Sequence, residues 1–410
     1  MRESPLSIED YPSGTDPLRI ALVTETYPPE INGVAMTLAR MVEGLRRRGQ
    51  FVQLVRPRQS GADSRALTGT IEEALTRGLP IPNYPGLRLG LPAKRQLLRL
   101  WREQRPDLVH VATEGPLGWS AIAAARLLRL PVSSDFHTNF DHYSRHYGFA
   151  WLKRPIGAYL RKFHNNTDLT LVPTEALRRE LLHQGYRRVE VIARGVDTRL
   201  FQPGRRSAEL RAAWGLVDGD LAVINVGRMA AEKNLPLVVR AFEAIRAKSP
   251  GAKLIFVGDG PERARLQRAH PEYIYCGMKT GEELASHYAS GDLFLFPSLT
   301  ETFGNVTLEA LASGCCVLAY QHAAAAELIR HGDNGLLAPA GDEPGFICAA
   351  VDLANSSAKE FARMRNRAVD SIAGHDWERI HDGFARILNE TVKTRLRLVQ
   401  AQAAVILAAE

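Results

Sequence analysis

Short apolar runs rich in β-branched residues alternate with amphipathic stretches along almost the whole chain. One such stretch is VAMTLARMVEGLRRRG at 34–49, whose apolar positions recur with the period of a helix. Apolar strands that alternate with helices are typical of parallel sheets covered on both faces. The strand-like runs form one group in each half of the chain, at 18–24, 51–55, 107–112, 131–137 and 168–174, and at 220–227, 252–260, 292–298 and 315–320. The pattern predicts an α/β fold with two doubly wound parallel sheets.

A stretch without a clear period separates the two groups of strands. The segment ARGVDTRLFQPGRRS contains two glycines and a proline, which is typical of a linker. A chain of 410 residues also suits two domains of roughly 200 residues each. We predict an N-terminal domain at 1–192, a linker at 193–207, a C-terminal domain at 208–375, and a helical segment at 376–410 that crosses back to the N-terminal domain.

Composition narrows the class of protein. Hydrophobic residues make up 45% of the chain and charged residues 24%, which fits a globular protein. No apolar run reaches the roughly eighteen residues of a membrane span, and the acidic start MRESPLSIEDYPSGTDP lacks the apolar core of a secretory signal. We therefore expect a cytoplasmic protein. Its four cysteines have no metal-ligand spacing and are expected to be reduced, buried thiols, at Cys276, Cys315, Cys316 and Cys348.

The net charge of +7 is unevenly distributed. Residues 1–200 contain 29 Lys and Arg against 20 Asp and Glu, whereas residues 201–410 contain 23 against 25. The N-terminal half, at +9, could meet an anionic surface such as lipid headgroups or nucleic acid, although an arginine-rich composition accounts for the charge equally well. The interleaved aromatic residues or recognition helix of a nucleic-acid-binding protein are not evident, so we expect no nucleic-acid partner.

Candidate chemistry follows the strands, because open α/β sheets bind ligands beyond the carboxyl ends of their strands. Asn32-Gly33 opens a helix after the first strand. In the second half, Arg228 and Lys233 follow one strand, GDGP at 258–261 follows the next, and ETFGNVTLE at 301–309 follows a third. Cations and helix N–H groups bind phosphates, and carboxylates bind pairs of hydroxyls. Together these groups suit a nucleotide diphosphate that carries a hydroxyl-rich group.

These residues carry a resemblance to a known family. The GR followed five residues later by lysine, the GDGP turn, and Glu-Thr-Phe-Gly with a second glutamate at the eighth position resemble the retaining, two-domain GT-B glycosyltransferases of the glycogen-synthase-like group. In the N-terminal half, TETYPPEINGVAMT, SDFHTNFDHYSRHYG and ARGVDTRLFQP are similar to bacterial GDP-mannose-dependent α-mannosyltransferases and sulfoquinovosyl-diacylglycerol synthases. The resemblance implies two Rossmann-like domains that face each other across a cleft.

The resemblance also implies a role for each matching residue. Arg228 and Lys233 would neutralise the donor diphosphate, and Gly33 would let the N-terminal loop close over it. Glu309 would bind the ribose. Glu301 would hold hydroxyls of the transferred sugar, helped by the backbone N–H groups around Phe303, Gly304 and Asn305. His137 would lie near the sugar, on the opposite lip of the cleft. The candidate catalytic residues are therefore His137, Glu301, Arg228 and Lys233.

The implied reaction is retaining transfer of a hexose from a nucleotide diphosphate sugar to a hydroxyl of a membrane lipid or a glycan, with no metal or other cofactor. GDP-mannose leads as donor, and UDP-linked glucose, glucuronate or sulfoquinovose follow. A nucleotide-sugar epimerase of the same fold is the alternative enzyme. Hydrolases also use two carboxylates near a sugar, but the spacing of Glu301 and Glu309 favours two contacts with one extended ligand.

Three features depart from the family pattern. Asn32-Gly33 stands where related chains often carry Gly-Gly, and YQHAAAAELI replaces the usual glycines ahead of Glu327. Asp218-Gly219-Asp220 imitates the metal-binding D-x-D of the other large glycosyltransferase fold. We interpret it as a turn before a strand, because the rest of such a site is missing.

The segment PAKRQLLRLWREQR at 92–105 concerns the acceptor side. A helix would place Leu97, Leu98, Leu100 and Trp101 on one arc. Such a helix either packs on the core or lies on an anionic membrane, and Trp with flanking arginines suits both. The candidate membrane-facing residues are Arg95, Arg99, Trp101 and Arg102.

Overall fold

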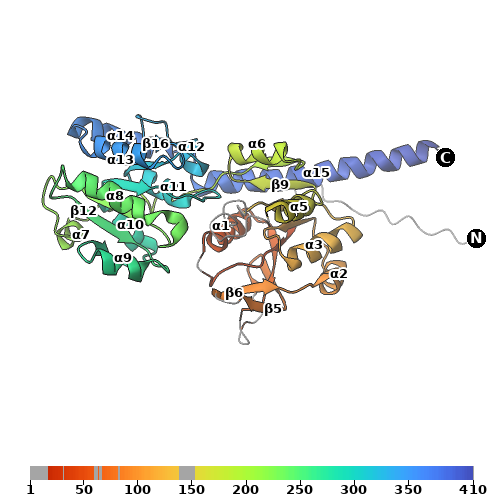
Figure 1. Ribbon diagram of the computed structural model, residues 1–410. Helices are drawn as coiled ribbons and strands as arrows, with labels where there is room; N and C mark the ends of the chain where they lie inside the picture. The colour runs from red at the N-terminus through yellow and green to blue at the C-terminus, as the bar shows by residue number, and fades with distance from the viewer. Residues whose placement is uncertain are drawn as a thin grey trace, which may run out of the picture.

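The computed structural model describes residues 17–409 apart from 31, 60–62, 64–66, 82–83 and 138–152. Two α/β bodies lie side by side, each with a sheet between layers of helices (Figure 1). The predicted α/β class with two parallel sheets is confirmed. The domain boundaries stay a prediction.

The first sheet has the strand order β10-β9-β8-β7-β1-β2-β4-β3 and is parallel except at β3. A separate antiparallel hairpin, β5-β6, precedes α2. The strands of the first sheet are β1 (Arg19–Val23), β2 (Phe51–Pro57), β3 (Leu67–Thr68), β4 (Ile71–Thr76), β7 (Leu108–Val111), β8 (Val132–Asp135), β9 (Leu169–Val172) and β10 (Val189–Val191). The hairpin consists of β5 (Gly78–Ile81) and β6 (Tyr84–Gly90). The helices described here are α1 (Gly33–Arg47), α2 (Lys94–Glu103), α3 (Pro116–Leu127), α5 (Lys153–His164) and α6 (Glu175–His183).

The second sheet is wholly parallel, with the order β13-β12-β11-β14-β15-β16. Its strands are β11 (Ala222–Val226), β12 (Lys253–Val257), β13 (Ile274–Tyr275), β14 (Leu293–Phe296), β15 (Cys316–Tyr320) and β16 (Leu336–Ala338). The helices are η2 (Pro203–Arg205), α7 (Ala208–Ala213), η3 (Ala231–Lys233), α8 (Leu235–Arg246), α9 (Arg263–Ala269), α10 (Gly281–Ser290), α11 (Asn305–Ala312), α12 (Ala323–Leu328), α13 (Glu343–Ala354) and α14 (Ala358–Ser371). Apolar side chains fill both faces of this sheet, as expected for buried parallel strands.

The last helix, α15 (Trp377–Ala409), leaves the C-terminal body and packs against the N-terminal one (Figure 1). Its side chains Ile380, Phe384, Leu388 and Val392 are buried in the same cluster as residues of β1, β2 and α1. The Phe384 ring meets His110 edge to face at a centroid distance of 5.2 Å. Within the described part of the chain, no helix is both long and apolar enough to cross a membrane.

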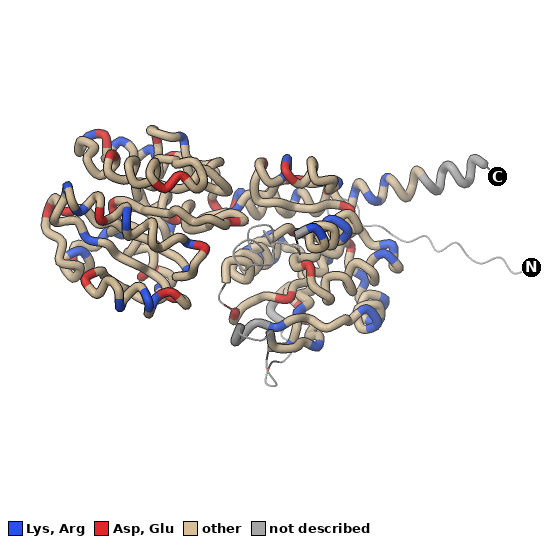
Figure 2. Tube along the Cα trace, viewed as in Figure 1, with Lys and Arg blue, Asp and Glu red and all other residues tan. Residues whose placement is uncertain are grey.

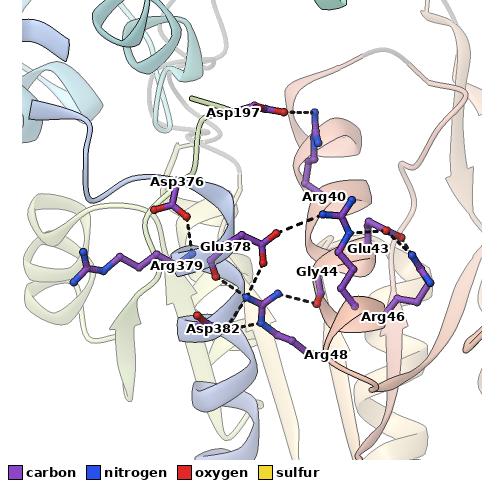
Figure 3. A network of polar contacts seen from close by, with 11 residues as sticks. Arg40, Glu43, Gly44, Arg46, Arg48, Asp197, Asp376, Glu378, Arg379 and Asp382 are labelled. Atoms are coloured by element: carbon purple, nitrogen blue, oxygen red, sulfur yellow. Dashed lines mark hydrogen bonds and ion pairs between the residues drawn. The ribbon is translucent and has the colours of Figure 1, made fainter. Parts of the chain in front are cut away.

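Ion pairs reinforce the contact between α1 and α15 (Figure 3). Arg48 lies between two carboxylates of α15, 2.7 Å from Asp382 and 3.1 Å from Glu378. Arg40 of α1 reaches Asp197, in the connection between the sheets, at 3.8 Å. Such pairs are exposed and contribute little individually. The buried apolar side chains therefore hold α15 in place, and the charges fix its orientation.

Candidate functional site

The C-terminal sheet reverses its strand order between β11 and β14, because β12 and β13 extend to one side of β11 and the later strands to the other. Open α/β sheets bind ligands at such a point, beyond the carboxyl ends of the strands. Arg228 and Lys233 follow β11, and Glu301 follows β14. The topology therefore brings these three predicted residues to one edge of one sheet.

Lys233 and Glu301 form an ion pair at this edge, between Nζ and Oε1. The Ser298 hydroxyl donates to the same oxygen at 2.8 Å, and Lys233 Nζ lies 5.4 Å from the centroid of the Phe296 ring. The side chains of Lys233 and Glu301 are only 17% and 13% exposed. A charge so shielded from water needs a partner, and here each supplies the other's.

Arg228 is exposed and pairs with Glu232, whose side chain is buried. The backbone carbonyl of Glu232 accepts a hydrogen bond from the N–H of Leu299 at 2.9 Å. This bond fixes the loop after β11 to the loop after β14. Arg228 therefore stands at the rim of the site while Lys233 lies inside it.

The loop after β14 ends in a turn that opens α11. Gly304 precedes the helix with φ near +93°, a conformation that suits glycine, and Asn305 is the first helical residue. Phe303 is buried and anchors the turn. The first N–H groups of a helix have no partner within it and carry positive partial charge. The backbone N–H groups around residues 303–305, which we expect to help hold the sugar, therefore follow closely after Glu301 in the chain.

Glu309 lies one turn inside α11 and is half-buried. The hydroxyl of Tyr288, a fully buried side chain, donates to its Oε2 at 2.9 Å. Burial raises the pKa of Glu309 to about 7, although the hydrogen bond from Tyr288 acts in the opposite direction. Glu301 faces a lysine, and Glu309 a neutral phenol. The two acids therefore differ in their electrostatic surroundings.

Glycines let neighbouring loops pack backbone to backbone beside this site. A Cβ on Gly258 would lie 2.0 Å from the carbonyl oxygen of Gly227, and one on Gly260 would lie 2.4 Å from that of Met229. Neither position can accept a larger residue without movement of the main chain. The predicted GDGP turn therefore packs directly against the backbone of the loop that carries Arg228.

In the N-terminal domain, Gly33 is the first residue of α1 and is exposed. A Cβ added there would meet no atom within 4 Å, so the space before this helix is open. Asn32 caps the helix, because its Oδ1 accepts the N–H of Ala35 at 2.9 Å. The departure from Gly-Gly therefore provides a helix cap, which glycine cannot supply through a side chain.

His137 follows β8 and is buried, with one ring nitrogen near a residue of β8 and the other near a residue of the connection between the sheets. Arg194 donates to Nδ1 at 2.8 Å, and Nε2 lies 3.1 Å from Oδ2 of Asp135. Burial and the charge of Arg194 lower the pKa of His137, so the ring is neutral at physiological pH. Burial alone would raise the pKa of Asp135, but His110 and His137 outweigh it and hold the pKa well below its usual value. Residues 138–148 of the quoted motif lie outside the described residues.

The candidate membrane helix is shorter than its motif and packs on the core. Trp101 is fully buried and donates from Nε1 to Gln53 at 2.9 Å, so its prediction as a membrane-facing residue is wrong. An amphipathic arc cannot distinguish a core from a membrane surface. Arg95, Arg99 and Arg102 remain exposed.

Two further expectations meet the structure. Asp218 and Asp220 lie in a turn before β11, at the opposite end of that strand from the site, as the interpretation of a turn requires. Cys315 and Cys316 are buried on opposite faces of the sheet, but Cys348 is exposed and Cys276 is half-buried. The expectation that all four thiols are buried is therefore wrong.

Among the described residues, no three His, Cys, Asp or Glu side chains gather in a way that could hold a metal ion.

Several residues of this region were not predicted from sequence. Asp135 and Arg194 lie inside the segments SDFH and ARGVD that carry the resemblance, so a charged pair flanking His137 could have been proposed. Tyr288 had no local signal, because its partner Glu309 is 21 positions away.

The raised pKa of Glu309 predicts a pH-dependent stability. A carboxyl with a higher pKa in the folded than in the unfolded state favours folding below its unfolded pKa, and this contribution is lost as pH rises through about 7. Glu309→Gln should therefore be more stable than the wild type at pH 8 by roughly 2 kcal/mol, and the difference should shrink toward pH 5. Thermal unfolding at both pH values measures this, with the exposed Glu190→Gln as control. A stability difference independent of pH would contradict the assignment.

Comparisons with known proteins identify the family to which this chain belongs. The model of Glycosyltransferase Family 4 matches residues 31–200, and that of Glycosyl transferases group 1 matches residues 220–356. A GDP-mannose-dependent alpha-mannosyltransferase of Mycobacterium tuberculosis is 34% identical over 373 residues, which cover 89% of this chain and 94% of that one. Sulfoquinovosyl transferase SQD2 of Arabidopsis thaliana is 31% identical over 374 residues, covering 89% and 70%.

Solved structures share the fold. Sucrose-phosphate synthase from Thermosynechococcus elongatus superimposes with a TM-score of 0.75 at 18% identity, covering 92% of this chain and all of that one. Anabaena HepE in complex with UDP and glucose gives a TM-score of 0.71 at 19% identity, covering 91% and 100%. The predicted GT-B architecture and the family resemblance are confirmed. The protein is a glycosyltransferase with the GT-B fold, and it belongs to the family of group 1, family 4 glycosyltransferases.

Proposed function

We propose that this enzyme transfers a hexose, with retention of configuration, from a nucleotide diphosphate sugar to a hydroxyl group of a membrane lipid. The observation that carries the proposal is the shielded Lys233–Glu301 ion pair at the switch point, with Glu309 one turn into the adjoining helix. A cation and a helix start suit the diphosphate of such a donor, and the two acids suit the hydroxyls of the sugar and of the ribose on either side of it.

The ion pair would exchange partners when the donor binds. In the free protein Lys233 balances the charge of Glu301, so this carboxylate would not repel an approaching anion. The diphosphate would take Lys233, and the hydroxyls of the sugar would then donate to the released carboxylate. Glu309 would accept from the ribose hydroxyls, an interaction that favours its ionised form.

The bond between the anomeric carbon and the departing phosphate oxygen breaks while the acceptor oxygen attacks from the same face. The proton of the acceptor hydroxyl passes to the departing phosphate, so no protein side chain is needed as base. Lys233, Arg228 and the N–H groups at the start of α11 would stabilise the charge that develops on the diphosphate, an effect that often dominates in such sites. This scheme requires no metal ion.

GDP-mannose is the leading donor, because the mannosyltransferase of M. tuberculosis is named for it. UDP-linked glucose, glucuronate or sulfoquinovose remain alternatives, since HepE was solved with UDP and glucose. A lipid acceptor is supported by the alpha-monoglucosyldiacylglycerol synthase of Streptococcus pneumoniae, which is 28% identical over 317 residues. A glycan acceptor is the alternative.

The two acids should fail in different ways. Glu309→Gln should weaken the binding of nucleoside diphosphate alone by about 1.5 to 3 kcal/mol, because a charged acceptor for the ribose is lost. Glu301→Gln releases Lys233 and should leave that affinity unchanged or tighter, while it weakens the intact nucleotide sugar and lowers turnover. Calorimetry with GDP and with GDP-mannose at pH 8, where Glu309 is ionised, makes the comparison.

The same experiment separates the alternatives. Equal loss of GDP affinity in both variants would contradict the division of roles. Unaltered donor binding with complete loss of activity in both would favour a catalytic acid and base pair. Release of GDP only in the presence of an acceptor supports transfer, whereas conversion of the donor sugar without an acceptor would favour an epimerase.

We also propose peripheral contact with the cytosolic face of the membrane through α2. Exposed arginines follow this helix along the outer side of the N-terminal body (Figure 2). They line an open depression of about 350 Å³, together with Leu98 and Glu103. Guanidinium groups around such a hollow suit the phosphates of anionic headgroups. The residues are Arg95, Arg99 and Arg102.

Binding to vesicles tests this surface. Each basic residue near an anionic membrane contributes about 1 kcal/mol, so changing Arg95, Arg99 and Arg102 to Ser should weaken binding to phosphatidylglycerol vesicles roughly tenfold or more. Added salt should weaken the wild type in the same way. The matched control changes Arg240, Arg265 and Arg330 of the C-terminal domain to Ser. An equal loss in both triple variants would show that net charge, and not α2, is responsible.

A further inference from the structure

The loop that carries Glu301 also contacts the opposite domain. The hydroxyl of Thr302 donates to the backbone carbonyl oxygen of His137 at 2.9 Å. Thr302 stands between the sugar-side acid and the buried Phe303, and His137 is the second residue after β8 of the N-terminal sheet. One hydrogen bond therefore joins the candidate donor loop to the other side of the cleft.

The residue that carries the accepting carbonyl, His137, is held in place by its own side chain. The side chain of His137 lies between Asp135 and Arg194, and all three are buried. Asp135 is also 3.4 Å from Nε2 of His110, whose Nδ1 is 2.9 Å from the Ser133 hydroxyl. Arg194 comes from the connection between the two sheets. The side chain of His137 is thus held by β8 and by the connection between the two sheets.

A second contact between the domains is made by α12, which is itself bonded to the loop that carries Glu301. The carboxylate of Glu327 accepts the N–H groups of Glu175 and Ala176, the first residues of α6, at 2.5 and 3.3 Å. This contact is exposed, and it lies at the end of α12. The N–H of Ala324 at the start of α12 donates to the carbonyl of Phe303 at 2.8 Å. A movement of one domain relative to the other would therefore shift the donor loop in two ways, through the bond from Thr302 to His137 and through α12.

The alanine-rich departure from the family pattern includes α12. Ala323 has a φ of +49°, in the left-handed region that a residue with a Cβ seldom adopts. A strained residue persists where its surroundings determine its conformation. Here those surroundings include the bond from Ala324 to Phe303 and the cap that Glu327 places on α6.

We propose that Thr302 is a positioning residue, which holds Glu301 in place for the sugar only when the two domains meet, with Glu327 as the supporting contact. The proposal rests on the proposed function of the Glu301 loop. It also gives His137 a role through its backbone carbonyl, because its side chain lies between Asp135 and Arg194. Donor binding and domain closure are coupled at this hydrogen bond.

Thr302→Val keeps the shape of the side chain and leaves the His137 carbonyl without its donor. The kcat for GDP-mannose should fall about tenfold, whereas the affinity for GDP should stay within about twofold, because the side chains proposed for the ribose and the diphosphate all belong to the C-terminal domain. Thr302→Ser retains a hydroxyl and should keep most of the activity. Thr391→Val is the matched control, since it removes a hydroxyl that donates within α15, to the carbonyl of Ile387 at 2.8 Å. Glu327→Ala should lower kcat by a smaller factor.

Small-angle scattering gives a readout that does not depend on activity. The double variant Thr302→Val, Glu327→Ala should have a larger radius of gyration than the wild type. Asp342→Ala, which removes a carboxylate cap within the C-terminal domain, should not. Wild-type kcat in Thr302→Val, an equal loss in Thr391→Val, or a parallel loss of GDP affinity would overturn the proposal, as would unchanged scattering of the double variant. Absence of transfer by the wild type would instead overturn the proposed function, and the scattering comparison would still test the coupling.

Discussion

The reversal of strand order between β11 and β14 places two chain segments that are far apart in sequence against each other, and the Lys233–Glu301 pair is the interaction that results. The residues are 68 positions apart, yet their side chains meet where water has little access. Neither charge could be held there alone without a large desolvation cost. Ser298, Phe296 and the bond from Leu299 to Glu232 all serve to hold this meeting point together.

The two acids acquire different chemistry from their neighbours. Glu301 faces a cation, the ammonium group of Lys233. Glu309 sits behind the first turn of α11 with a phenol as its partner, and burial moves its pKa to about 7. A ligand with a diphosphate between two hydroxyl-bearing groups would compensate both environments. In the N-terminal domain the space beside Gly33 is open, and the His137 carbonyl accepts a hydrogen bond from Thr302.

Sequence reasoning succeeded where a local pattern determines the result. Apolar strands followed by glycine, cations or acids located the edge of the C-terminal sheet, because parallel strands all end at one edge. It failed where the partner is remote or the pattern is ambiguous. Trp101 belongs to an amphipathic arc that suits a core and a membrane equally, and only the fold shows that it packs beside Gln53. The ion pair itself, the bond from Tyr288 to Glu309 and the contact from Thr302 to His137 depend on topology and domain arrangement, which no window of sequence contains. The short β5-β6 hairpin, which precedes α2, also went unpredicted.

We infer that donor binding breaks the ion pair between Lys233 and Glu301, and that each side chain then contacts the donor instead. A crystal structure of the enzyme with bound GDP-mannose tests it most directly, through the distances that the two side chains make. The account predicts that the pair is separated, with Lys233 Nζ within hydrogen-bonding distance of a diphosphate oxygen and the Glu301 carboxylate within reach of the mannose hydroxyls. An intact ion pair between Lys233 and Glu301, with the nucleotide sugar bound elsewhere, would contradict it.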